Sequence, residues 1–198
     1  ELTIGMPPFV TAGTGLDAFA HCVEAFSSPH YHPMSQGIAV EGMRLVIENL
    51  PKVYNNPNDI EARSHMMSAA MMGATAFQKG LGAIHALSHP IGAMYNTHHG
   101  TTNAVCMPAV LGLNASEISQ RFDQVAGYIG IQNGFKGFCT FVREFNASLK
   151  IPMNLSDLGV VNADVEKLTE AALKDPSCGG NPVTLNSENV AKLIKDLL

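Results

Sequence analysis

The spacing of apolar residues predicts helices along almost the whole chain. In "SEISQRFDQVAGYIG", Ile118, Phe122, Val125 and Ile129 recur three or four positions apart, which is the spacing of one face of an amphipathic helix. No segment alternates between apolar and polar residues with the period of two that is typical of a half-buried strand. The pattern therefore predicts an all-α fold, a bundle of helices.

Turn-forming and cap-forming residues set the expected helix boundaries. Thr14 is a candidate N-cap because its hydroxyl can accept a hydrogen bond from a free backbone N–H group. The segment before it contains Pro7 and Pro8 and is expected to be a loop. The sequence "NNPN" is typical of a turn. The expected helices span residues 14–26, 34–50, 60–78, 81–89, 100–113, 116–130, 134–149, 163–173 and 187–198.

The helix expected over residues 60–78 contains "SHMMSAAMMGATAF", which is rich in methionine and small residues. Small residues at helical spacing let two backbones approach closely, and methionine fills irregular gaps in a core. We therefore expect this helix to be the central, buried one.

Composition and charge exclude several classes of protein. The 198 residues are 46% hydrophobic and 15% charged, as in a globular chain with a large core and no disorder. The net charge of -5 argues against nucleic-acid binding. No apolar run approaches the roughly 20 residues of a membrane span. The four cysteines are far apart and form no CxxC pair, which favours a reducing compartment, the cytoplasm. The chain starts on Glu1, so we expect a piece of a longer protein.

Histidines gather in "GAIHALSHPIGAMYNTHHG", which holds His85, His89, His98 and His99, half of the chain's eight. His85 and His89 are four residues apart, so on a helix they share one face. Taken alone, such a pair is often part of a core. A buried imidazole, however, needs partners for both ring nitrogens, and this segment offers few polar groups. The cluster therefore suggests a binding site.

A second pair lies earlier in the chain, where Asp17 and His21 are also four residues apart in "GTGLDAFAHCVEAF". A carboxylate and an imidazole on one helix face can reach the same cation. An isolated pair with this spacing is more often a helix-stabilising contact, or an aspartate placed favourably near a helix N-terminus. The pair gains weight only beside the histidine cluster.

Geometry limits how the histidine segment can form one site. If residues 85–99 were one helix, its ends would lie about 21 Å apart, at roughly 1.5 Å per residue. Pro90 disfavours helical geometry at His89, so we expect the chain to turn back there and bring the "THHG" loop toward His85. Adjacent side chains usually point in different directions, so we expect only one of His98 and His99 to bind a metal.

The residue types indicate which metal such a site would hold. One carboxylate with several imidazoles suits a first-row divalent ion such as iron(II) or zinc, whereas calcium and magnesium require more oxygen ligands. Among the remaining histidines, His30 and His32 lie in a proline-containing loop and are interpreted as surface or cleft-rim residues. His65 is interpreted as a packing or surface residue.

Three segments together resemble a known family. "GTGLDAFAHCVEAF", "AFQKGLGAIHALSHPIGAMYNTHHGTTNAVCMPAVLGLN" and "DPSCGGNPVTL" are similar, in this order, to the C-terminal metal-binding domain of the iron-containing (group III) alcohol dehydrogenases. The resemblance covers nearly the whole chain. It implies that the four metal ligands are Asp17, His21, His85 and His99.

The same resemblance implies two further roles and a domain organisation. His89 would be the catalytic residue near the nicotinamide, relaying a proton or positioning the substrate, and Phe77 would line the substrate pocket. Family members have an N-terminal α/β domain that binds the dinucleotide and a helical C-terminal domain that carries the metal. Because the chain contains no GxGxxG segment, we expect residues 1–198 to be the helical metal-binding domain alone, with the dinucleotide-binding domain absent and the isolated chain inactive.

The resemblance also implies an activity and its partners. The full-length enzyme would interconvert an alcohol and an aldehyde by hydride transfer, with Fe(2+), or alternatively Zn(2+), and with NAD or NADP bound by the missing domain. Its partners would be a small alcohol or aldehyde and further copies of itself in a homo-oligomer, with no nucleic acid and no membrane. Three alternatives remain open: a zinc-dependent enzyme domain related to glycerol dehydrogenase or dehydroquinate synthase, a catalytically inactive helical metal-binding module, and a helical bundle whose histidines only satisfy core hydrogen bonds.

Overall fold

The computed structural model describes residues 1–198 and confirms the all-α fold, with no strand. Short 3-10 helices occupy Phe77–Lys79 (η1), Ser156–Leu158 (η2) and Pro176–Gly180 (η3). The eight α-helices are α1 (Pro8–Ser27), α2 (Pro33–Asn55), α3 (Ile60–Ala76), α4 (Ala83–Tyr95), α5 (His99–Tyr128), α6 (Gly134–Ser148), α7 (Val165–Leu173) and α8 (Ser187–Leu197).

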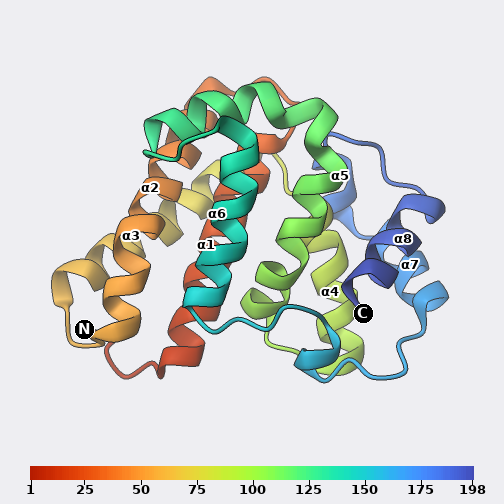
Figure 1. Ribbon diagram of the computed structural model, residues 1–198, viewed down its shortest axis with the longest axis horizontal. Coiled ribbons are helices and arrows are strands. Elements are labelled where there is room, and N and C mark those ends of the chain that lie inside the picture. Colours follow the sequence, from red (N-terminus) through yellow and green to blue (C-terminus); the bar gives the residue numbers. More distant parts are fainter.

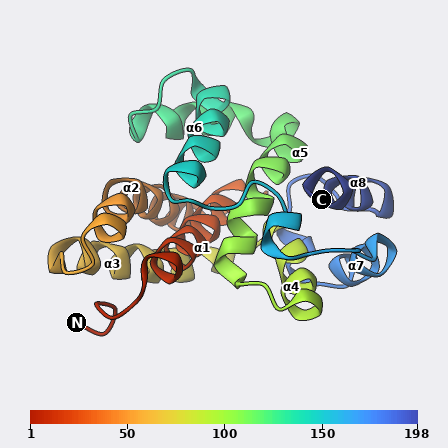
Figure 2. The ribbon, with the colours of Figure 1, turned by 60° about the horizontal axis from the view of Figure 1, so that its bottom comes forward.

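The helix at the centre of the bundle is α1. It contacts α2 and α3 on one side and α5 on the other, and α5 in turn contacts α4 and α6. Figure 1 shows this progression from α2 and α3 on the left to α7 and α8 on the right, and Figure 2 shows α6 lying over α1 and α5. The aromatic rings of Phe19, Phe122 and Phe138 meet where these three helices join, with centroids 4.8 to 6.1 Å apart along the chain of contacts. The burial of α1 on several sides explains why fourteen of its twenty residues are buried.

The first helix starts earlier than the sequence predicted. It begins at Pro8, with proline in its first turn and no side-chain cap, because proline's fixed φ suits the start of a helix and its missing N–H group has no partner there in any case. Thr14 lies inside the helix, where its hydroxyl donates to the carbonyl oxygen of Val10 at 2.8 Å. The expected N-cap at Thr14 was therefore wrong.

The turn that was expected at Pro90 occurs six residues later. Pro90 is inside α4 and buried, and the helix continues to Tyr95. It ends at Asn96, whose left-handed backbone (φ 52°, ψ 39°) reverses the chain before α5 begins at His99. Asparagine adopts this conformation more easily than most residues. The chain does turn back as expected, but the packing of the buried Pro90 outweighs the cost of the hydrogen bond that proline cannot make.

The helices expected over residues 100–113 and 116–130 are one continuous helix, α5. Asn114 lies in the middle of it and is buried. Its side-chain amide exchanges two hydrogen bonds of 2.9 Å with the amide of Asn181. An asparagine side chain without a partner competes for the backbone hydrogen bonds of a helix and favours a break. At Asn114 the bonds to Asn181 remove this competition, and the helix continues.

The expectation that the methionine-rich helix is central was wrong, although its close packing was expected correctly. α3 lies at the edge of the bundle and has only five buried residues, and Met71 is 67% exposed. On the inner face, a Cβ atom at Gly73 would lie 3.0 Å from both the carbonyl oxygen of Ala18 and Cβ of His21. The small residues of α3 thus let it approach α1 beside His21.

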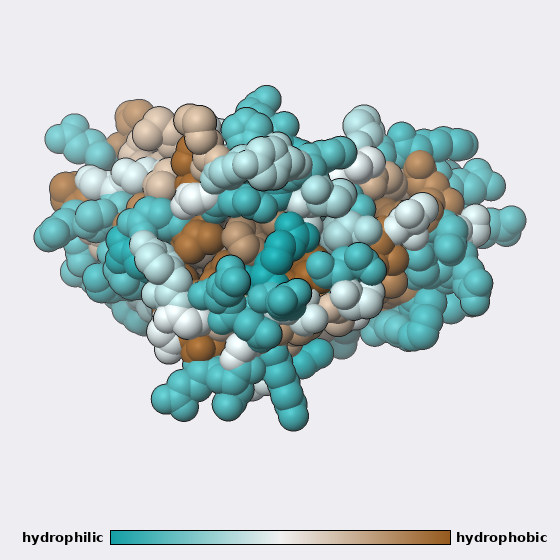
Figure 3. Space-filling model, turned by 90° about the horizontal axis from the view of Figure 1, so that it is seen from above, coloured by the Kyte–Doolittle hydropathy of each residue, from teal (hydrophilic) through white to brown (hydrophobic).

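The surface mixes residue types on the face seen in Figure 3, where hydrophobic residues show in several separate places between hydrophilic ones. None of the eight helices combines the length and apolar character needed to cross a bilayer.

Two cationic side chains donate hydrogen bonds to the carbonyl groups at the C-terminal end of α1. Lys79, which is buried, donates from Nζ to the carbonyl oxygens of Ala25, Phe26 and Ser28 at 2.6 to 3.4 Å. Arg121 donates to the carbonyl oxygen of Ser27 at 2.7 Å and to two of the same carbonyl groups. The last carbonyl groups of a helix have no partner within the helix, and their partial negative charge favours cations.

We expect Lys79→Met to lower the free energy of unfolding by about 1–3 kcal/mol, because it removes a charged donor from buried carbonyl groups. Urea unfolding followed by circular dichroism measures the change. Lys174→Met is the matched control, since Lys174 is 79% exposed, and it should change stability by less than about 0.5 kcal/mol. Equal effects of the two substitutions would contradict the role of Lys79.

Candidate metal centre

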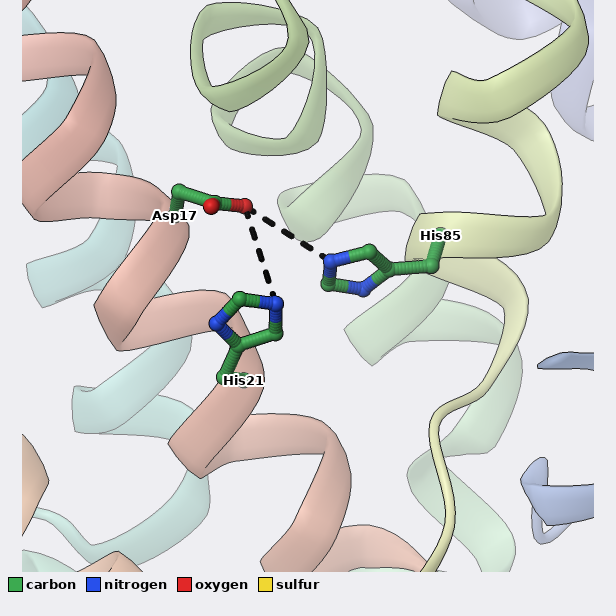
Figure 4. A group of neighbouring side chains, drawn as sticks. All are labelled: Asp17, His21 and His85. Atoms are coloured by element: carbon green, nitrogen blue, oxygen red, sulfur yellow. Dashed lines mark ion pairs between the residues drawn. The ribbon is translucent and has the colours of Figure 1, made fainter. Parts of the chain in front are cut away.

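Three of the proposed ligands meet between α1 and α4. Asp17 and His21 lie one turn apart on α1, and His85 lies in the first turn of α4. Asp17 Oδ1 is 4.0 Å from His21 Nε2 and 3.6 Å from His85 Nε2, as Figure 4 shows. One potential ligand atom from each residue lies within 4.8 Å of the other two. The carboxylate and the two imidazoles therefore converge on one region, as a shared cation requires.

The fourth proposed ligand, His99, lies beside this group. Its Nε2 is 3.3 Å from Asp17 Oδ1, and its side chain is 44% exposed. It is not among the residues whose ligand atoms all lie within 4.8 Å of one another. A Cβ atom at Gly100 would collide with the backbone of Gly13, so glycine at this position lets the first turn of α5 rest on α1. That close approach places His99 next to Asp17.

The neighbouring His98 is directed elsewhere. It is the N-cap of α5, and its Nδ1 lies 3.0 Å from Thr101 Oγ1 and accepts a hydrogen bond from the backbone N–H group of Thr101 at 3.3 Å. Its ring contacts Phe9 edge-on, with centroids 5.3 Å apart. The two adjacent histidines thus point in different directions, and only His99 faces Asp17.

Glu24 holds His85, and sequence reasoning did not identify it. Its Oε2 is 2.5 Å from His85 Nδ1, and both side chains are almost fully buried. Its Oε1 accepts hydrogen bonds from the backbone N–H groups of Ile84 at 2.6 Å and His85 at 3.4 Å, at the start of α4. With Nδ1 donating to Glu24, Nε2 of His85 is the nitrogen that faces Asp17. The available signal was an acidic residue on the buried face of α1, one turn after His21.

Burial and neighbouring charges shift the pKa values of Asp17, His21 and His85. Burial raises the pKa of Asp17, but hydrogen bonds with His85 and His99 outweigh it and hold the pKa below its usual range. Burial lowers the pKa of His85, but the carboxylates of Asp17 and Glu24 raise it to about 9. Burial lowers the pKa of His21 more than Asp17 raises it. The carboxylate is therefore ionised at neutral pH and can act as a ligand.

His89 lies at the open side of the group. Its ring stacks on His99 with centroids 5.4 Å apart and an interplanar angle of 12°, and its side chain is 42% exposed. Its Nδ1 is 2.8 Å from Oδ2 of Asp175, the N-cap of η3. Hydrogen bonds from Ser177 and His89 outweigh burial and lower the pKa of Asp175. Asp175 is the first residue of "DPSCGG", part of a segment that is similar to the family. No role for this residue was predicted from the sequence.

The structure also places the remaining candidates. Phe77 begins η1, and its half-buried ring lies 5.1 Å from the ring of His21. His30 is exposed, and His32 is exposed and caps α2 by accepting a hydrogen bond from the backbone of Ser35. His65 lies 45% exposed on α3. These positions agree with Phe77 beside the site and with surface locations for the other three histidines.

The chain matches known proteins over nearly its whole length. It is 36% identical over 204 residues to the 4-hydroxybutyrate dehydrogenase of Cupriavidus necator, covering 98% of this chain and 53% of that protein. It is 33% identical over 208 residues to the NAD-dependent methanol dehydrogenase of Bacillus methanolicus, covering 100% of this chain and 54% of that protein. The chain thus spans about half the length of the curated relatives it matches.

A solved structure agrees with the sequence matches. The crystal structure of a 1,3-propanediol oxidoreductase superposes with a TM-score of 0.93 at 30% identity, over 98% of this chain and 53% of that one. The family model that describes the C-terminal part of the Fe-containing alcohol dehydrogenases matches residues 11–198. Fold, sequence and family model agree, and the chain belongs to the Fe-containing alcohol dehydrogenase family, as its C-terminal region.

Proposed function

We propose that this chain is the metal-binding part of an alcohol dehydrogenase that interconverts a small alcohol and its aldehyde with NAD or NADP. The observation that carries the proposal is the convergence of Asp17, His21 and His85, with His99 beside them. The relatives are alcohol dehydrogenases about twice as long. The activity is therefore proposed for the complete polypeptide, with a further domain binding the dinucleotide.

The donor set fits the metal that the family description names. Asp17, His21, His85 and His99 offer one carboxylate oxygen and three imidazole nitrogens, which suit Fe(2+) and also Zn(2+). His85 directs Nε2 into the group because Glu24 binds Nδ1. A partner that fixes the second ring nitrogen is typical of metal-binding histidines. When bound, such an ion supplies a Lewis acid that stabilises negative charge developing on the oxygen of the substrate.

The residues at the open side provide the other functions. Asp175 accepts the Nδ1–H of His89, so His89 Nε2 is free to accept the hydroxyl proton when the alcohol is oxidised. In the reverse direction it returns the proton to the same oxygen as hydride adds to the carbonyl carbon of the aldehyde. Phe77 contacts His21 and offers an apolar surface to the carbon chain of the substrate. The partial exposure of His89 and His99 leaves this side accessible to substrate and nicotinamide, whose hydride chemistry belongs to the cofactor.

The composition of the chain bears on the setting of the enzyme. We propose that it acts in the cytoplasm as a homo-oligomer, without nucleic acid or membrane as a partner. The net negative charge argues against a nucleic-acid partner, and the four free cysteines favour a reducing compartment.

His89→Ala separates the proposed proton relay from metal binding. In the longest polypeptide that the gene encodes, we expect the variant to keep its metal and to lose about 100- to 10,000-fold in kcat, the usual contribution of general acid–base catalysis. Asp175→Asn should give a smaller loss, because His89 remains but is oriented less well. Steady-state kinetics with short primary alcohols and elemental analysis of the same preparations test this. Loss of metal from His89→Ala would overturn the division between ligands and relay.

A further inference from the structure

Asn103 lies within the group of proposed ligands, although neither the sequence motifs nor the proposed chemistry gives it a role. It follows His99 by one turn on α5 and is 0% exposed. Its Nδ2 is 2.7 Å from Asp17 Oδ1, 3.1 Å from His99 Nε2 and 3.2 Å from His85 Nε2. One amide nitrogen thus contacts three of the four proposed ligands at the atoms that face one another.

The orientation of this amide follows from its neighbours. An ionised carboxylate only accepts hydrogen bonds, so turning the amide round would place Oδ1 against an oxygen of Asp17 at a repulsive distance. In the orientation observed, Oδ1 of Asn103 is buried and has no hydrogen-bond partner. Leaving a buried acceptor unpaired costs free energy. The hydrogen bond from Nδ2 to Asp17 therefore fixes the orientation of the amide and leaves Oδ1 without a partner.

The number of donors and acceptors limits what Asn103 can do at one time. Its NH₂ group carries two hydrogens, and it lies beside one carboxylate oxygen and two imidazole nitrogens, each of which accepts a hydrogen bond only when that nitrogen carries no proton. The imidazole nitrogens each have one lone pair, which a metal ion would take. The Asp17 carboxylate has further lone pairs, so its bond to Asn103 is the one that can persist beside a metal ion.

We propose that Asn103 is a positioning residue that fixes the Asp17 carboxylate and keeps the ligands of α1, α4 and α5 converged for a divalent metal. The inference rests on the proposed function, since it concerns the same metal site. Asn103 acts through hydrogen bonds to the ligands and is not itself a ligand. Residues that orient metal ligands in this way typically change metal affinity by about 10- to 100-fold.

Asn103→Leu tests the proposal, because it keeps the size of the side chain and removes its donors. We expect Fe(2+) and Co(2+) to bind about 10- to 100-fold more weakly in anaerobic competition with a chelator. We also expect the visible absorption bands of the Co(2+) protein to change, because the carboxylate is no longer fixed. Asn103→Ser, whose hydroxyl is too short to reach Asp17, serves as a second variant if leucine prevents folding.

Asn146 provides a matched control on α6. It is also a buried asparagine with an unpartnered Oδ1, and its Nδ2 donates to the carbonyl oxygen of Ala104 at 2.7 Å. Asn146→Leu should leave metal affinity and the Co(2+) spectrum unchanged, whatever it does to stability. Wild-type affinity and spectrum in both Asn103 variants would overturn the role of Asn103 and leave the proposed function intact. Absence of metal binding in the wild-type chain would overturn both.

Discussion

Alanine at His85 is expected to remove the metal from the purified chain. The substitution deletes the most deeply buried of the proposed ligands, 1% exposed, and leaves Glu24 as a buried carboxylate without its imidazole partner. We expect metal affinity to fall by more than about 100-fold, beyond the effect typical of a residue that only orients a ligand. Elemental analysis after anaerobic incubation with Fe(2+) and desalting measures the loss.

His65→Ala is the control for this measurement. His65 forms an i,i+4 pair with Glu61 on α3, with its Nε2 3.9 Å from a carboxylate oxygen, much as His21 pairs with Asp17 on α1. It lies outside the proposed centre, so its variant should bind metal like the wild-type chain. Equal metal content in His85→Ala and the wild type would show that His85 is not a ligand.

Glu24→Ala is expected to have the largest effect on stability, about 3–5 kcal/mol of unfolding free energy in the metal-free chain. The substitution removes the acceptor of two backbone N–H groups at the start of α4 and of the imidazole of His85. Buried donors are then left without partners. Urea unfolding measures the change, with Glu24→Gln as an intermediate case because its amide oxygen still accepts.

Glu170→Ala serves as the comparison for Glu24. Glu170 is 65% exposed and pairs with Lys174 across one turn of α7 at 3.9 Å. Exposed pairs of this kind contribute little, so the variant should change stability by less than about 0.5 kcal/mol. A loss as small as this in Glu24→Ala would mean that Glu24 does not hold α4.

The sequence predicted the fold class because helical periodicity is a local property. It misplaced the ends of helices at positions where contacts with other helices determine whether a helix continues. Pro90 was expected to end a helix, yet burial keeps it within α4. Asn114 was placed between two helices, yet its side chain pairs with Asn181, 67 residues away. A methionine-rich segment was expected to be central, but the composition of α3 could not reveal that only one of its faces meets the bundle.

The candidate site likewise has residues that the sequence indicated and residues that only the structure showed. The four-residue spacings predicted that Asp17 and His21 share a face, and the structure agrees. Glu24, Asn103 and Asp175 were missed because each acts on a histidine or carboxylate of another helix. Helical spacing places Glu24 on the face of His21 and Asn103 on the face of His99, but it does not indicate a partner on a different helix. The sequence therefore indicated the candidate ligands, whereas the residues that hold them became visible only in three dimensions.

The most direct test of the account is anomalous diffraction, at the iron absorption edge, from crystals of this chain grown anaerobically with Fe(2+). The account predicts one anomalous peak at roughly 2.0–2.2 Å from Asp17, His21, His85 and His99, the range for nitrogen and oxygen ligands of such ions. This measurement also decides whether His99, which lies beside the three converging residues, completes the set. A peak elsewhere, or none at these residues in crystals grown with Fe(2+), would contradict the metal centre and the function proposed from it.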